Sequence, residues 1–469
     1  MNASLKPHWN YDYSKILWMK MYLADPDFPN NRSNVYISFE QALEIIMAVD
    51  HLTQGTQKIV YLVGWQGLGH DDCYPEMDVV NEALKRPQDK TARDSLYWLY
   101  EEAKKYHTVV SFHVNVSDAY TATPCFPQLA AANALVNNRE GKPTPIEIFN
   151  GRDGYKTSYK QFWESGLFRQ VWDRFCEVTP VQEAGTVHID NFCIAENLNP
   201  RTGVEEQDEA RNKMLDYIAS LGIDVTSEYT YREAPLRNES PTHPIRKLYQ
   251  TLGEDMTEVP WETVPIRTLG RIPATWWTSC VSMRECIDIP PALYSGHLND
   301  PAQMKVFYGA MHGEDIWRKH GPRAEDWAPA FLREFCTYHL PYVYLNRYQR
   351  LRYEEDPSAE AEDRYTVYFS DGVVSRATDR SIRKNGAALK TGGDVLLPLD
   401  ERNEVFIAYS DEGKSGEWDI PDAAFEIADV YEITPEGNVP CGEAAVRDGK
   451  IALTVKPGQA LAIVARPAR

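Results

Sequence analysis

The chain has 469 residues, more than one hydrophobic core usually holds, so we expect two or three domains. Its hydrophobic content of 43% and charged content of 25% are ordinary for a folded protein and argue against a disordered chain. The formal net charge of −20 argues against a nucleic-acid partner or an anionic membrane surface, because both would repel it.

Apolar runs and amphipathic segments alternate through the first half of the chain. The apolar runs predict β-strands at 16–23, 58–64, 108–114, 185–190 and 222–227. The segments between them predict helices at 39–50, 92–106, 161–178 and 205–220. This alternation is typical of a parallel α/β sheet or barrel.

Two long loops, at about 65–90 and 115–160, follow the second and third predicted strands. In a barrel, loops on that face carry substrate specificity. Beyond residue 235 the periodicity weakens, and helices are expected only at 303–319 and 326–350.

The last hundred residues have a different pattern. A charged stretch with a proline, EEDPSAEAED at 354–363, is typical of a linker. After it, short runs of period two separated by turn residues predict an antiparallel β-sandwich. We therefore divide the chain into a catalytic α/β domain at 1–355 and a C-terminal β-sandwich at 364–469, which we interpret as a stabilising lid.

The cysteines and the N-terminus favour a cytoplasmic protein. The eight cysteines form no CxxC pair and no zinc-ligand spacing, so we expect reduced thiols. The first residues contain no apolar signal core, although a trimmed leader would leave the same pattern, and no run approaches the length of a membrane span. The oligomeric state is left open.

Two predicted strands end on a carboxylate. TVHIDNF at 186–192 carries Asp190, and LGIDVTSE at 221–228 ends on Glu228. Neighbouring strand ends in a barrel lie roughly 5 Å apart, and a retaining glycosidase needs its two carboxyl groups about 5–5.5 Å apart. The spacing therefore predicts a catalytic pair, although a strand-end Asp can also simply cap the next loop.

A polar loop follows the second strand, with the sequence WQGLGHDDCYP. His70 and Asp71 suit hydrogen bonding to sugar hydroxyls, and Trp65 suits stacking on a sugar face. The alternative is that His70 and Asp71 only tie the loop to itself. The glycines do not form GxGxxG and no P-loop Lys follows, so phosphate binding is not expected.

The third strand ends in FHVNVSDAY, with His113, Asn115 and Asp118 predicted on the same rim as Asp71 and Asp190. Strand alternation places His113 and Asn115 on one side. A lone histidine here would more often be a satisfied core residue, but the neighbouring Asn and Asp favour a functional role.

Further residues are weaker candidates. Trp276 and Trp277 could stack on a sugar, although core packing is the safer interpretation for at least one of them. A third site residue could come from the later loops, at His297, Asp300, Glu314 or Asp315. No cofactor is expected, and calcium is only a secondary possibility, at the hard oxygen donors Asp71, Asp72, Glu76 and Asp78.

The order of these motifs resembles a known enzyme family. YLVGWQGLGHDDCYP, then HVNVSDAY, then VHIDNF, then an acidic residue ending the next strand are similar to the motifs of the glycoside hydrolase family 101 endo-α-N-acetylgalactosaminidases and the related family 129 enzymes. The resemblance covers roughly residues 16–230. It implies a (β/α)8 TIM-type barrel with an antiparallel β-sandwich, and retaining hydrolysis of α-linked N-acetylgalactosamine in O-glycans.

The resemblance also implies residue roles. Asp190 would be the nucleophile and Glu228 the general acid/base, while His70-Asp71 match a GHD motif whose Asp holds sugar hydroxyls. Asn115 matches the Asn of an HxNxxEAY motif, but the acidic position is Asp118 here, one methylene shorter than Glu. We expect an exo-acting enzyme on a small carbohydrate or glycopeptide. The alternatives are an α-galactosidase or α-glucan-active barrel, and a non-catalytic carbohydrate-binding barrel.

Overall fold

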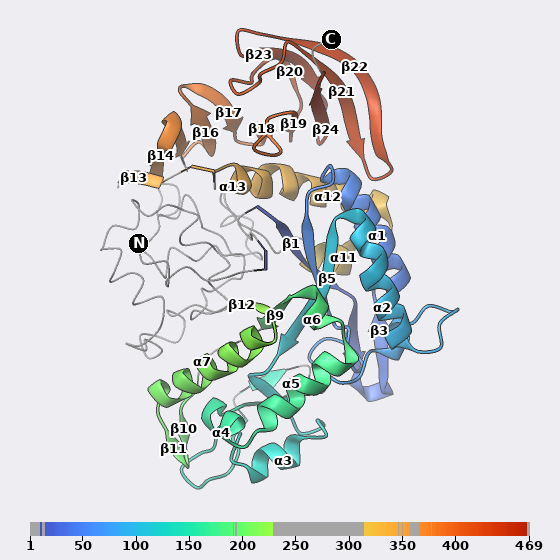
Figure 1. Cartoon of the computed structure of the whole chain (residues 1–469), viewed down its shortest axis with the longest axis vertical. Helices are drawn as coiled ribbons and strands as arrows, with labels where there is room; N and C mark the ends of the chain where they lie inside the picture. Colours follow the sequence, from blue (N-terminus) through green and yellow to red (C-terminus); the bar gives the residue numbers. More distant parts are fainter. Residues whose placement is uncertain are drawn as a thin grey trace.

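A computed structural model describes residues 10–11, residues 15–227 except 146, 150, 191, 193 and 194, and residues 314–466 except 346, 349, 357, 359–364 and 377. Figure 1 shows these residues as a parallel α/β region and a C-terminal β region. Five of the predicted site residues lie outside the described residues: Glu228, Trp276, Trp277, His297 and Asp300.

The α/β region is built on a parallel sheet of five strands in the order β1-β4-β5-β9-β12, which is also their order along the chain. These are the five strands that the apolar runs predict, at Leu17–Tyr22, Lys58–Val63, Thr108–Asn115, Thr186–Asp190 and Asp224–Ser227. The described residues do not include a closed barrel, so the eight-stranded barrel stays a prediction.

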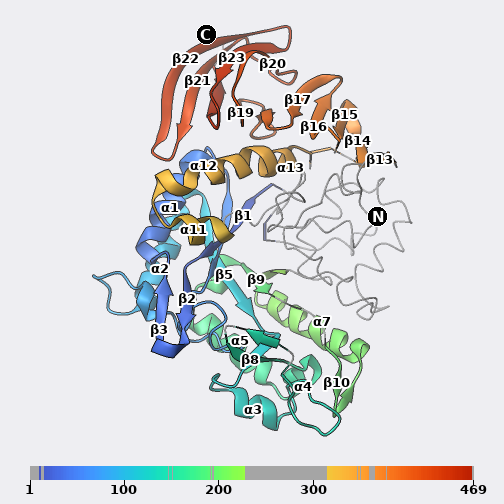
Figure 2. The ribbon, with the colours of Figure 1, turned by 180° about the vertical axis from the view of Figure 1, so that it is seen from behind.

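The two faces of this sheet differ in chemistry. On β5, Val110, Phe112 and Val114 alternate with Ser111, His113 and Asn115, and all six side chains are buried. The apolar set packs against helices, as the contact between Phe112 and Phe175 of α5 (Leu167–Val178) shows, with ring centroids 5.5 Å apart. The polar set lies on the same side of the sheet as Thr186 and His188 of the neighbouring strand β9, which are also buried. Figure 2 shows the helices on the outer side of the sheet.

The helices of this region are α1, α2, α4, α5, α6 and α7, at Phe39–Leu52, Ala92–Ala103, Tyr159–Glu164, Leu167–Val178, Val181–Ala184 and Val204–Ser220. The helix predicted at 161–178 is two helices, because Gly166 has φ 79°, in the left-handed region, and interrupts the helix between α4 and α5.

Short strands that the sequence did not predict also form. A hairpin of β2 (Ala24–Asp27) and β3 (Arg32–Val35) follows β1. The loop after β5 contains helix α3 (Phe126–Ala131) and a three-stranded sheet in the order β6-β8-β7, at Asp118–Tyr120, Arg152–Lys156 and Glu147–Phe149. Strand β6 begins three residues after the end of β5, so this small sheet lies beside the carboxyl end of β5.

The C-terminal strands form one antiparallel sheet of twelve, which confirms the antiparallel prediction. The order is β13 to β19, then β24-β21-β22-β23-β20, and β20 also contacts β17 and β18, so the sheet curls back on itself. The strands are Arg350–Glu355, Tyr365–Phe369, Val373–Arg376, Ser381–Lys384, Ala387–Thr391, Asp394–Pro398, Val405–Ser410, Lys414–Asp419, Ile427–Thr434, Gly437–Arg447, Lys450–Val455 and Ala460–Ala465.

Two parts of the chain differ from the prediction before this sheet. The helix expected at 326–350 consists of α12 (Ala324–Glu334), a π-helical turn at Phe335–His339 and α13 (Leu340–Leu345). Strand β13 then begins at Arg350, so the sheet starts before the linker expected at 354–363. Helix α11 (Glu314–His320) precedes α12 and contacts β1.

Polar contacts fasten the C-terminal sheet to the α/β region. His51 Nδ1 lies 2.7 Å from the Pro435 carbonyl, and the amides of Gln54 and Asn438 bond to each other at 2.9 and 2.7 Å. The Arg333 guanidinium of α12 binds the Asp411 carboxylate through two hydrogen bonds of 2.9 and 3.1 Å. Helices α12 and α13 lie between the two sheets (Figures 1 and 2).

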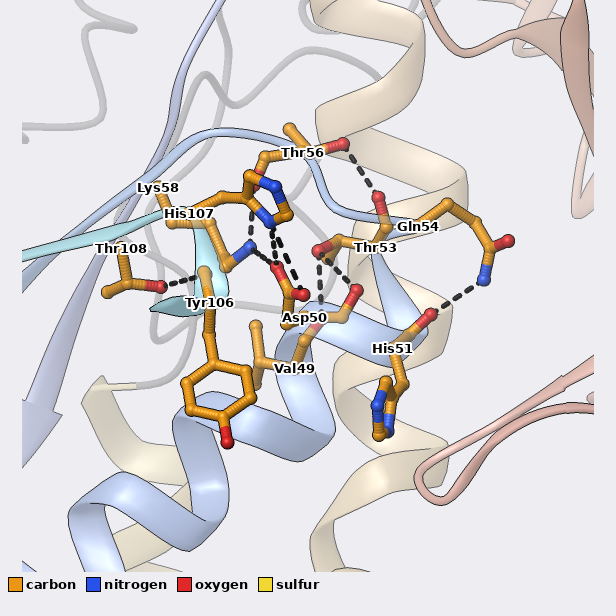
Figure 3. Close-up of polar contacts among 10 residues, drawn as sticks. All are labelled: Val49, Asp50, His51, Thr53, Gln54, Thr56, Lys58, Tyr106, His107 and Thr108. Atoms are coloured by element: carbon orange, nitrogen blue, oxygen red, sulfur yellow. Dashed lines mark hydrogen bonds and ion pairs between the residues drawn. The ribbon is translucent and has the colours of Figure 1, made fainter. Parts of the chain in front are cut away.

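A buried ion pair lies at the amino end of the parallel sheet (Figure 3). The Lys58 ammonium, at the start of β4, donates to Asp50 Oδ1 at 2.5 Å and to the Thr56 carbonyl at 2.6 Å. The exposed ring of His107 binds the same Asp50 carboxylate at 3.1 Å. Burial lowers the pKa of Lys58, and the hydrogen bond and charge of Asp50 oppose this change.

Replacing Asp50 by Ala should lower the free energy of unfolding by about 3–5 kcal/mol, because the fully buried Lys58 ammonium loses its counterion. Urea unfolding would measure the loss. Glu102→Ala removes the exposed Lys105–Glu102 pair and should cost less than about 1 kcal/mol. The double variant Asp50→Ala/Lys58→Met should recover much of the stability; an Asp50→Ala loss no larger than that of the control would contradict this account.

Two further features bear on the sequence predictions. The five cysteines within the described residues are free thiols, namely Cys73, Cys125, Cys176, Cys336 and Cys441. Over the same part of the chain, we find no helix with both the length and the apolar character that crossing a membrane requires.

Candidate active site

Asp190 is the last residue of β9 and lies at the carboxyl end of the parallel sheet. Thr186 and His188, four and two positions earlier, are buried on the same face of the strand. The Asp190 side chain keeps 15% of its surface exposed, whereas His113 beside it keeps only 1%. Asp190 is therefore a carboxylate on this face that a ligand could reach.

Two side chains of β5, Asn115 and His113, flank the Asp190 carboxylate. Strand register pairs Asn115 with Asp190 and His113 with His188. Asn115 Nδ2 donates to Asp190 Oδ2 at 3.4 Å, and His113 Nε2 lies 3.7 Å from the same oxygen. The hydrogen bond from Asn115 restricts the rotation of the Asp190 carboxylate.

The orientation of the Asn115 amide is set by its own neighbours. Its Oδ1 accepts from the backbone N–H groups of Ser117 and Asp118, at 2.9 and 3.0 Å, and from the Ser117 hydroxyl at 2.9 Å. Three donors on the oxygen leave the nitrogen to face carboxylates. Nδ2 donates to Asp118 Oδ2 at 2.6 Å as well as to Asp190.

Asp118 lies behind Asn115 and is only 4% exposed. Its Oδ2 accepts from Asn115, and its Oδ1 accepts from the Lys156 ammonium. Asp118 and Lys156 are register partners between β6 and β8. Both oxygens of the predicted sugar ligand Asp118 are thus engaged by protein groups.

His70 and Asp71 lie at the same end of the parallel sheet as His113 and Asp190. His70 Nε2 lies 3.4 Å from Asp71 Oδ2, and the His70 ring is 5.3 Å from both the Tyr22 and the His113 rings. The loop passes very close to β2: a Cβ at Gly64 would lie 2.1 Å from the Ala24 carbonyl oxygen, so only glycine fits there. The His70–Asp71 contact also means that part of their role is to hold the loop.

Tyr74 lies near both Asp71 and Asp190. It is fully buried and donates from its hydroxyl to the His113 carbonyl at 3.3 Å. Burial, and next the charges of Asp71 and Asp190, raise the pKa of Tyr74 well above its usual value. The phenol therefore stays protonated, and its surroundings show that the Asp71 and Asp190 carboxylates converge on one region.

Sequence reasoning missed two buried residues of this cluster, His188 and Lys156. The His188 ring is 5.3 Å from the His113 ring and 5.5 Å from the Tyr61 ring, and it extends the row of rings below Asp190. Alternation within VHID would have placed His188 on the face of Asp190. Lys156 had no comparable signal, because its partner is 38 residues away in a sheet formed inside a predicted loop.

Trp65 must be reassigned from sugar stacking to the core. It is fully buried, with ring centroids 4.8 Å from Phe112 and 5.6 Å from Phe175. Its indole Nε1 donates to the His113 carbonyl at 3.1 Å. The strand-end position is correct, but Trp65 packs towards helix α5 and offers no free face to a sugar.

The acidic residues considered for calcium bind different protein groups. Asp72 accepts from the Leu68 N–H at 2.9 Å and from Arg152 at 3.1 Å, and Glu76 accepts from the Cys125 N–H at 3.0 Å. Desolvation raises the pKa of Glu76. Within the described ranges, no three His, Cys, Asp or Glu residues gather as a group able to hold a metal ion.

The remaining candidates are less well placed. The last register pair between β9 and β12 joins Ile189 to Ser227, the residues immediately before Asp190 and Glu228 in the sequence. Glu228, like Trp276, Trp277, His297 and Asp300, lies outside the described residues. Glu314 and Asp315 begin helix α11.

Comparison with known proteins found no matching family model and no matching curated protein. Similar solved structures include an α-N-acetylgalactosaminidase from Bifidobacterium bifidum (14% identity, TM-score 0.49, 81% of this chain and 59% of that one). Others are an Anoxybacillus α-amylase (11%, 0.39, 98% and 100%) and a Thermus thermophilus α-galactosidase (11%, 0.28, 47% and 39%). This chain thus spans less than two thirds of the first enzyme's length. Because all three TM-scores are below 0.5, we base nothing below on these likenesses.

Proposed function

We propose that this chain is a retaining α-glycoside hydrolase that releases α-linked N-acetylgalactosamine from O-glycan-type substrates. The observation that carries the proposal is the Asp190 carboxylate, partly exposed at a strand end and flanked by Asn115 Nδ2 at 3.4 Å and His113 Nε2 at 3.7 Å. Catalytic carboxylates of barrel enzymes occupy this position. The α-configuration and the sugar come from the motif resemblance.

In the proposed reaction, the ionised Asp190 attacks the anomeric carbon while protonated Glu228 gives its proton to the departing aglycone oxygen. Glu228, now a carboxylate, then takes a proton from the water that hydrolyses the glycosyl-enzyme. Asn115 would hold the Asp190 carboxylate in place through its hydrogen bond to Oδ2. His70 and Asp71 would hold sugar hydroxyls at the same rim.

A panel of p-nitrophenyl glycosides tests the proposal. We expect turnover of the α-N-acetylgalactosaminide, with at least about tenfold lower kcat/KM for the α-galactoside and α-glucoside, and none for the β-N-acetylgalactosaminide. A preference for the α-galactoside would keep the mechanism and change the sugar. Binding of N-acetylgalactosamine without turnover of any glycoside would refute the enzyme and support a carbohydrate-binding barrel.

A further inference from the structure

Lys156 is a buried cation next to the candidate nucleophile, and the reaction outlined above gives it no part. It is the last residue of β8, and its side chain and that of Asp118 are only 8% and 6% exposed. A buried ammonium is costly unless it is paired, and Asp118 is the partner that compensates it here.

The backbone around Lys156 is fixed. Thr157 donates from its N–H to the Ser117 carbonyl at 2.8 Å and from its hydroxyl to the Val116 carbonyl at 2.8 Å. The Lys156 carbonyl accepts from the Val136 N–H at 2.8 Å. Strand β8 therefore holds the Lys156 ammonium in a fixed position beside the segment that follows β5.

Hydrogen bonds lead from this ammonium to Asp190. Lys156 donates to Asp118 Oδ1, and Asp118 Oδ2 accepts from Asn115 Nδ2 at 2.6 Å. The same Asn115 nitrogen donates to Asp190 Oδ2 at 3.4 Å. The described residues thus connect one cation and two carboxylates through a single amide.

We propose that Lys156 is a positioning residue for Asp190: its ammonium neutralises Asp118 and, through the Asn115 amide, fixes the carboxylate at the end of β9. The description of Asp190 as a nucleophile rests on the proposed function, whereas the coupling itself rests only on the contacts above. Asp118 is then the middle of a relay, which fits its shorter side chain at a position where the resembling family has Glu.

Removing the charge of Lys156 and removing the charge of Asp118 should have opposite effects on the ionisation of Asp190. With Lys156 present, the relay carries one excess negative charge, that of Asp190. Lys156→Met adds the uncompensated charge of Asp118, which should disfavour ionisation of Asp190. Asp118→Asn leaves the Lys156 charge uncompensated, which should favour it.

The experiment follows the carboxyl carbon of Asp190 by ¹³C NMR in pH titrations, with its resonance identified by its loss in Asp190→Asn. The titration midpoint should rise by about one unit in Lys156→Met and fall by a similar amount in Asp118→Asn. Lys156→Arg should restore it. Midpoints within about 0.3 unit of wild type in both Lys156→Met and Asp118→Asn would overturn the proposal.

A matched control is Lys160→Met, which removes the exposed Lys160–Glu206 pair four residues away and should leave the Asp190 midpoint unchanged. A shift in this control equal to that in Lys156→Met would also overturn the proposal. If Lys156→Met does not fold, Asp118→Asn and the neutral double variant Lys156→Met/Asp118→Asn carry the test, with a midpoint near wild type expected in the double variant.

Activity provides a second readout that separates this proposal from the function. In Lys156→Met, kcat should fall about tenfold to a hundredfold with KM within threefold, because the nucleophile is displaced and the sugar contacts remain. If the wild-type chain hydrolyses no glycoside, the proposed function fails, while the NMR titration still tests the relay.

Discussion

Asp190→Asn should reduce kcat on an aryl α-N-acetylgalactosaminide at least about 10⁴-fold, the largest effect that we expect from a single substitution. The amide keeps the size of the side chain but cannot form the glycosyl-enzyme. The environment should tolerate the change, because the side chain is partly exposed and an amide has nearly the same size and shape as a carboxylate. Steady-state kinetics with the purified variant measure the loss.

A control with the same chemical change is Asp224→Asn. Asp224 is the first residue of β12 and lies at the amino end of the same parallel sheet. Asp224 accepts from the Asn10 N–H at 2.8 Å, and this variant should keep its activity within about threefold. Added azide should partly restore turnover in Asp190→Asn, because it can enter the space left by the nucleophilic oxygen. An Asp190→Asn variant with most of its activity would show that the nucleophile lies elsewhere.

Glu228→Gln should show the second-largest effect, and the effect should depend on the leaving group. A glycopeptide substrate leaves as a poor alkoxide and needs protonation, so its kcat/KM should fall about 10²–10⁴-fold. A dinitrophenyl glycoside leaves without protonation, so the step that forms the glycosyl-enzyme should be nearly unaffected in pre-steady-state measurements.

The comparison of the two substrates is the decisive part of this second prediction. Glu206→Gln, on the exposed surface of α7, is the matched control and should change neither substrate by more than about twofold. Equal losses on both substrates in Glu228→Gln would mean that Glu228 is not the proton donor.

The parallel strands could be predicted because each lies in a short run rich in apolar residues, between amphipathic segments. All five were found within two residues of their predicted ends. The break between α4 and α5 was missed because the periodicity of 161–178 continues through Gly166, and only its positive φ of 79° reveals the interruption. The hairpins inside the long loops were missed because their strands are three to five residues long.

The sequence predicted the positions of the strand-end residues of the site better than it predicted their roles. The rule that parallel strands end at one edge brought His70, Asp71, His113, Asn115 and Asp190 together. Spacing alone could not show that Trp65 turns towards Phe175, since that depends on where α5 packs. The ion pair of Asp118 with Lys156 requires the β6-β8 register, which no local pattern specifies.

The most direct test of the account is to trap the glycosyl-enzyme with a fluorinated, slowly turned over α-N-acetylgalactosaminyl substrate and to map the adduct by peptide mass spectrometry. The account predicts one sugar per chain, attached to the peptide that contains Asp190. A sugar attached to a different carboxylate, or hydrolysis of a good substrate without any covalent adduct, would contradict it.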